Sequence, residues 1–118
     1  MNYIFDNDRP IYLQLVERIR IEIVSGKLKQ GERLPSVREL ARMMQVNPNT
    51  MQKALAELGD EQLIYTDRTN GKYVTLNIER IAKVKRNLAK EKVKQYIKSM
   101  ESLGINNEEA IQYLTEQK

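Results

Sequence analysis

Residues 36–59 constrain the fold more than any other part of this chain. Apolar residues recur there at positions i, i+3, i+4 and i+7 in two successive runs. The runs are Val37, Leu40, Ala41 and Met44, followed by Met51, Ala54, Leu55 and Leu58. This spacing places each run on one face of a helix with 3.6 residues per turn. The stretch therefore predicts two short amphipathic helices.

Capping and helix-breaking residues define where these helices begin and end. Ser36 is a favourable N-cap, and Glu39 three residues later completes a capping box. Pro48 ends the first helix, because it disfavours the α conformation in the residue before it. Asn47 can cap the second helix, with Pro48 in its first turn. Two short helices with a tight turn form a helix-turn-helix, although an αα-hairpin in a small helical core would show the same spacing.

The outer side of the second predicted helix carries polar side chains that can bond bases or phosphates. They are Asn49, Thr50, Gln52 and Lys53. No acidic residue occurs between Glu39 and Glu57, so no carboxylate near the start of this helix repels a phosphate. The N-terminus of a helix also favours an anion. These features favour DNA binding over a generic helical hairpin.

Composition argues against several other classes of function. The chain has 118 residues and a formal net charge of +4, compatible with one small domain, an appendage and a polyanionic partner. It has no cysteine and no histidine, which removes thiol chemistry, the usual zinc ligands and the commonest general base. We therefore expect no enzyme activity, no metal and no cofactor. Without an apolar run near about 18 residues or a signal-peptide pattern, we expect a cytoplasmic protein.

Other elements are predicted on both sides of the motif. Residues 1–9 form an arm expected to pack on the domain or on a second copy, and a helix covers residues 10–25. The inward stripe of that helix is Tyr12, Leu15, Val16, Ile19 and Ile23, and its mostly outward charged residues are Arg18, Arg20 and Glu22. Residues 33 and 34 could pair with the edge of a later hairpin.

A β-hairpin is predicted after the motif, from the β-prone segments 63–66 and 72–76. Asn70-Gly71 between them is the strongest short hairpin signal. A helix-turn-helix followed by a hairpin is a winged helix. The wing tip offers Arg68, Thr69, Asn70 and Lys72, which suit phosphate or minor-groove contact, with a solvated loop as the alternative.

A helical tail is predicted from residue 78, with a long helix over residues 78–103, a stop at Gly104 and a last helix capped by Asn106 or Asn107. Ile111 and Leu114, with Ala110 as a further candidate, are expected to face Ile105 and the long helix. Because this hairpin is too small to bury its own apolar stripe, we expect a second copy to cover it. The predicted dimer interface is Val93, Tyr96, Ile97, Met100, Leu103, Ile111 and Leu114.

The sequence thus predicts an α+β fold, mostly α, with a winged helix-turn-helix domain over residues 1–76 and a two-helix dimerisation tail over residues 77–118. Most of the excess positive charge lies between Arg80 and Lys98. This stretch is interpreted as a solvated helix face in preference to a second DNA-facing surface.

Residues 9–76 resemble the DNA-binding domain of the GntR family of bacterial transcriptional regulators. The resemblance rests on GERLPSVRELA, a turn, an NTMQKALAEL helix and a wing. The short tail is similar to that of the YtrA-type subgroup, which implies no large effector-binding domain and dimerisation through the tail. It also implies a repressor, often of an operon encoding an ABC transporter. A symmetric dimer would bind a palindromic operator.

The resemblance implies DNA contacts by Arg38 in the PSxRxLA motif, by the start of the recognition helix and by the wing glycine. The predicted DNA-binding set is Arg38, Asn47, Asn49, Thr50, Gln52, Lys53, Arg68, Asn70, Gly71 and Lys72. The alternative for Arg38 is an ion pair with Glu32 or Glu39. Two other functions stay open, namely a protein–protein interaction module and a ligand sensor whose tail encloses a small molecule.

Overall fold

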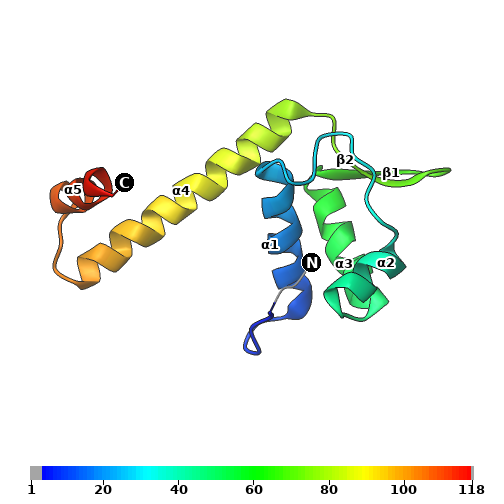
Figure 1. Ribbon diagram of the computed structural model, residues 1–118, viewed down its shortest axis with the longest axis horizontal. Helices are drawn as coiled ribbons and strands as arrows, with labels where there is room; N and C mark the ends of the chain where they lie inside the picture. Colours follow the sequence, from blue (N-terminus) through cyan, green and yellow to red (C-terminus); the bar gives the residue numbers. More distant parts are fainter. Residues whose placement is uncertain (1–3, 118) are drawn as a thin grey trace. The chain divides into compact units, whose positions relative to one another are not determined.

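The computed structural model describes residues 4–117 (Figure 1). The elements in chain order are α1 (Ile11–Val24), α2 (Val37–Met44), α3 (Pro48–Asp60), β1 (Ile64–Asp67), β2 (Gly71–Val74), α4 (Ile78–Ser102) and α5 (Asn107–Glu116). They form two packed units, one ending at Lys83 and the other beginning at Val84, so α4 belongs partly to each. The predicted fold class, mostly helical with a winged helix-turn-helix, is confirmed, and the domain boundary at residue 76 stays a prediction.

The core of the first unit lies where α1 and α2 pack against α3 (Figure 1). The apolar stripes predicted for these helices form it, together with Leu63, which follows α3, and Val74 of the hairpin. Its buried members include Leu15, Val16, Ile19, Ile23, Leu40, Ala41, Met44, Met51, Ala54, Leu55, Leu58, Leu63 and Val74. Tyr12 and Val37, at the margins of their stripes, are only half-buried.

The turn between α2 and α3 has the predicted capping interactions. The Ser36 hydroxyl accepts a hydrogen bond from the Glu39 amide (3.1 Å), and the Glu39 carboxylate accepts one from the Ser36 amide (3.3 Å). The side-chain oxygen of Asn47 accepts from the Asn49 amide (2.8 Å), and Pro48 occupies the first turn of α3. Gln45 leaves α2 in the left-handed conformation at φ 57°, which makes the turn tight.

The wing consists of β1 and β2 paired in antiparallel register, with Ile64 opposite Val74 and Asp67 opposite Gly71. The segment before α2 pairs with the free edge of β2, as predicted: the Leu34 amide donates to the Lys72 carbonyl (2.8 Å). The turn differs from a two-residue Asn-Gly turn. Only Gly71 has positive φ (103°), and the Asp67 carboxylate closes a three-residue turn by accepting from the Thr69 amide (3.0 Å).

The charged residues of α1 do not lie mostly outside, and that expectation was wrong. Glu22 is buried, and its carboxylate lies 3.0 Å from the Arg18 guanidinium in an ion pair, without hydrogen-bond alignment. Arg20 donates two hydrogen bonds to Glu61, at 2.8 and 2.6 Å. Gln14, Arg18 and Glu22 follow one another at intervals of four, which aligns them as a polar row beside the apolar stripe.

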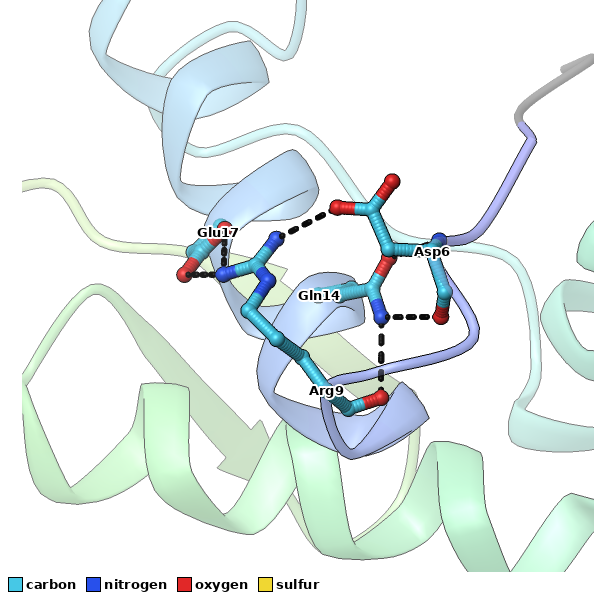
Figure 2. A network of polar contacts seen from close by, with 4 residues as sticks. All are labelled: Asp6, Arg9, Gln14 and Glu17. Atoms are coloured by element: carbon cyan, nitrogen blue, oxygen red, sulfur yellow. Dashed lines mark hydrogen bonds and ion pairs between the residues drawn. The ribbon is translucent and has the colours of Figure 1, made fainter.

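The arm, within residues 4–9, packs on α1 of the same chain, whereas residues 1–3 lie outside the described part. Figure 2 shows the Gln14 side chain pointing into the bend of the arm. Its amide nitrogen donates to the carbonyls of Asp6 (2.9 Å) and Arg9 (3.0 Å), and its oxygen accepts from the Asp6 amide (2.7 Å). Arg9 also binds Glu17. These bonds satisfy a fully buried amide, which would otherwise be costly.

In the second unit, α4 and α5 are joined through Gly104, at φ 77°. Asn106 caps α5, and Ala110 is its buried residue, with the Tyr96 hydroxyl donating to the Ala110 carbonyl (2.6 Å). Ile111 and Leu114 are exposed, so the expectation that they face Ile105 and the long helix was wrong. Within residues 4–117 no helix is both long and apolar enough to cross a membrane.

Candidate nucleic-acid interface

The first predicted contact residue, Arg38, lies on the exposed side of α2. The two carboxylates that could have paired with it have other partners. Glu39 belongs to the capping box, and Glu32 accepts a hydrogen bond from the Lys29 amide (2.9 Å). Arg38 forms no ion pair within residues 4–117, so the alternative of an ion pair with Glu32 or Glu39 is not observed. Its guanidinium is therefore available to an external anion.

The start of α3 brings the predicted base-reading residues together. Asn49 and Gln52 are exposed, and neither side chain forms a hydrogen bond with another described residue. Asn47 differs, because its side-chain oxygen already accepts a hydrogen bond that caps the helix, while its amide donors are free. At 3.6 residues per turn, Asn49 lies near the middle of the outward face, opposite the buried Met51 and Leu58. Neutral amides thus occupy the exposed face near the helix start.

Thr50 and Lys53 lie on the flank of α3 that faces α1. The Lys53 ammonium is 3.8 Å from the centre of the Tyr12 ring, in a cation–π contact. Beside it is an open hollow of about 440 Å³, lined by Ile11, Tyr12, Asn49, Thr50 and Lys53. The sequence analysis placed Tyr12 in the core stripe and missed this contact. No periodicity within α1 or α3 could have revealed it, because it depends on how the two helices cross.

The wing contributes cations around a second cleft, of about 280 Å³, between the hairpin and the segment leading to α2. Arg33, Arg68 and Lys72 line it together with Asp67. Lys72 donates to the Thr66 hydroxyl (3.1 Å), and Arg68 is exposed at the tip. Arg33 was not predicted as a site residue, although its expected pairing with the hairpin was a signal that it lies beside the wing.

Hydrogen bonds around Asp67 and the backbone conformation of Gly71 hold the shape of the wing tip. The pKa of Asp67 is lowered because its ionised carboxylate accepts hydrogen bonds from the amide and hydroxyl of Thr69. The Asn70 side chain also donates to Asp67, over a long 3.4 Å. A Cβ on Gly71 would lie 3.6 Å from the Arg33 guanidinium, which is ordinary contact, so backbone conformation alone requires glycine there. The tip is therefore ordered by its own side chains.

These groups lie on two successive helices, α2 and α3, and on a hairpin that carries cations. The chain also matches known regulators. The family model "Bacterial regulatory proteins, gntR family" matches residues 11–74. The chain belongs to this family.

Similarity to individual relatives extends beyond the family domain into the tail. The chain is 36% identical to the HTH-type transcriptional repressor YtrA of Bacillus subtilis, over 91% of this chain and 83% of YtrA, which supports the YtrA-type subgroup. A solved GntR family regulator from Listeria monocytogenes has a TM-score of 0.88 and 43% identity, covering 97% of this chain and all of that one (100%). The DNA-binding domain of AraR, solved with operator ORX1, has a TM-score of 0.58 and 25% identity, covering 64% of this chain and 95% of that one.

Proposed function

We propose that this GntR-family protein is a sequence-specific DNA-binding transcriptional repressor and not an enzyme. The observation that carries the proposal is the exposed row of Arg38, Asn49 and Gln52, whose side chains have no partner in the described chain. Their donors and acceptors are exposed to solvent on two successive helices, where an external ligand can reach them. The operator complex of AraR and the repressor name of YtrA support the same function by similarity.

Within this function the residues divide into two roles. Asn49 and Gln52 read bases, because an amide side chain can bond adenine bidentately in the major groove. Arg38 binds a phosphate, because the first helix of a helix-turn-helix crosses the DNA backbone. The wing cations Arg68 and Lys72 bind the flanking backbone or the minor groove, with Asn70 and Gly71 at the tip.

A binding experiment tests the two roles separately. The operator is first located by footprinting the protein on the promoter region of its own gene. Asn49→Ala or Gln52→Ala should weaken operator binding by about 1–3 kcal/mol and leave binding to random DNA nearly unchanged. Arg38→Ala should weaken binding to both DNAs and reduce the salt slope by about 1.

Lys27→Ala is a charge-matched control for Arg38→Ala. Lys27 lies just after the C-terminal end of α1. The N-terminal end of α1 is the one beside the start of α3, so Lys27 is separated from that region by the length of the helix, roughly 20 Å. This variant should retain the wild-type salt slope. Equal losses on operator and random DNA for Asn49→Ala would count against base reading. A wild-type protein without salt-dependent DNA binding would instead favour the protein–protein interaction module.

The proposed repressor acts as a homodimer through its tail and binds a palindromic operator. Val93, Leu103, Ile111 and Leu114 are each more than half exposed in the single chain, while Tyr96, Ile97 and Met100 are half-buried. Burial of each large apolar side chain against a second copy would contribute about 1.5–3 kcal/mol. Two recognition helices in such a dimer would read half-sites about 10 bp apart, or a multiple of that.

The dimer is tested with a charge placed on the exposed side of α5. Leu114→Glu should shift the protein from dimer to monomer in sedimentation at micromolar concentration and weaken operator binding. Gln112→Glu, which adds the same charge at another exposed position of α5, should leave the dimer intact. A monomeric wild-type protein, or a Leu114→Glu variant that dimerises as well as the wild type, would disprove this assembly.

From the resemblance to the YtrA-type subgroup, we further propose that the regulated operon encodes an ABC transporter. Deep sequencing of genomic DNA fragments retained by the purified protein would identify the operator. Enrichment only of promoters unrelated to transport would refute this assignment without affecting the DNA-binding proposal.

A further inference from the structure

The contact between Lys53 and Tyr12 holds a cation at the edge of the recognition helix. The Lys53 ammonium is 3.8 Å from the centre of the Tyr12 ring, and the ring is half-buried between α1 and α3. A lysine side chain on a solvent-exposed helix normally samples many rotamers, which costs entropy when it binds a phosphate. A ring that restricts the side chain beforehand reduces that cost.

This contact does not use the three N–H donors of the Lys53 ammonium for hydrogen bonds. Aromatic faces attract a cation through their quadrupole and do not replace the oxygen acceptors of its three N–H donors. Glu57, four residues along α3, would be the usual partner. The two form no ion pair among the described residues. Lys53 is therefore positioned but free to bind an anion.

The neighbourhood of Lys53 fits a phosphate better than a base. Lys53 lies on the flank of α3 next to α1, beside a hollow of about 440 Å³ that also exposes Thr50, whose hydroxyl forms no hydrogen bond to another described residue. The neutral amide of Asn49 also lines this hollow, and that of Gln52 lies farther from it on the exposed face. A cation and a hydroxyl beside an open hollow match the common contacts to a DNA phosphate.

We propose that Tyr12 is a positioning residue that holds Lys53 for a backbone phosphate of DNA, received in this hollow with Thr50 as a second donor. The inference rests on the proposed function, because it assigns a subsite to the DNA-binding surface. Tyr12 acts through Lys53 and not through a hydroxyl contact of its own.

A double-mutant cycle on the full-length protein tests the coupling between the two residues. Lys53→Ala should weaken binding to operator and random DNA alike and reduce the salt slope by about 1. Tyr12→Leu should weaken both by about two- to five-fold, the range of an exposed cation–π contact. In the Lys53→Ala background, Tyr12→Leu should have almost no further effect. Tyr12→Phe, which keeps the ring, should bind like the wild type.

Two results would overturn the proposal. If Tyr12→Leu weakens binding equally with and without Lys53, the residues are not coupled and Tyr12 acts on folding. If Tyr12→Phe loses as much affinity as Tyr12→Leu, the hydroxyl binds DNA directly. A wild type that binds no DNA would refute the proposed function itself, whereas DNA binding with an additive cycle would refute only this inference.

A measurement on the wild-type protein does not depend on the stability of any variant. Methylene protons above an aromatic ring are shifted upfield in the NMR spectrum by the ring current. The Lys53 protons next to the ammonium should show this shift in the free protein. Random-coil shifts for these protons would overturn the proposal even if Tyr12→Leu fails to fold.

Discussion

The ion pair between Arg20 and Glu61 joins the C-terminal half of α1 to the end of α3, and Glu61→Gln should destabilise the first unit. Arg20 donates two hydrogen bonds to the Glu61 carboxylate, at 2.8 and 2.6 Å, and both side chains are less than a quarter exposed. The pKa of Arg20 is raised, chiefly because of its hydrogen bond to Glu61. The pair is therefore shielded from water, unlike the ion pair of Arg9 with Glu17 on the surface.

The expected magnitude lies between those of a surface pair and a fully buried one. Exposed ion pairs contribute at most about 1 kcal/mol, and breaking a buried pair costs about 3–5 kcal/mol. Glutamine keeps one oxygen acceptor for Arg20 and loses the charge, so we expect a loss of about 2 kcal/mol. For a domain of 60–100 residues this corresponds to a fall in Tm of roughly 8–16 °C.

Thermal unfolding followed by circular dichroism measures this effect, with Glu57→Gln as the matched control. Glu57 is exposed one turn earlier on α3 and contributes only a smaller, through-space interaction with Arg20, so this variant should unfold close to the wild type. Operator affinity of Glu61→Gln at low temperature should be unchanged, because Glu61 is at the opposite end of α3 from Asn49. Equal Tm values for Glu61→Gln and the wild type would refute the reasoning.

Three further results are expected. Ser36→Ala removes the capping box of α2 and should lower the free energy of unfolding by about 1 kcal/mol in urea denaturation. The lowered pKa of Asp67 means that its stabilising contribution is complete above its ordinary value of 3.8 and is lost as the pH falls through the lowered pKa; the Thr69 amide resonance should therefore shift only in acid, and Asp67→Asn should abolish that titration. Raising the salt concentration should weaken binding to operator and random DNA nearly in parallel, because the proposed base-reading side chains are neutral.

Elements set by local sequence could be predicted, and contacts between elements far apart in the chain could not. The capping box at Ser36 and the cap at Asn47 depend on residues two or three positions away, so their geometry followed directly. The pairing of Arg20 with Glu61 spans 41 residues, and it required knowing that the end of α1 lies beside the end of α3. The buried position of Glu22 was missed because a charged residue was assumed to face water, although Arg18 at i−4 offered a local partner.

The same distinction separates the parts of the candidate site. Exposure of Asn49 and Gln52 followed from the periodicity of α3, because the apolar residues fix which side of the helix is buried. The surroundings of Lys53 and Arg33 depend on neighbours from α1 and from the wing, which periodicity does not place. The turn predicted over residues 67–71 is observed, and its type is set locally, because the Asp67 carboxylate closes a three-residue turn that needs positive φ only at Gly71.

The distribution of charge on the proposed surface indicates which DNA contacts contribute affinity and which contribute sequence preference. Cations lie on three elements of the proposed surface, namely Arg38 on α2, Arg68 in the wing, and Lys53 on the side of α3 next to α1. Between them, Asn49 and Gln52 present neutral donors and acceptors. Phosphates are the same at every base pair, so the surrounding cations can supply affinity and register but no sequence preference. Direct base reading in the major groove is therefore left to the few amide groups, and a symmetric dimer would double their number at one operator.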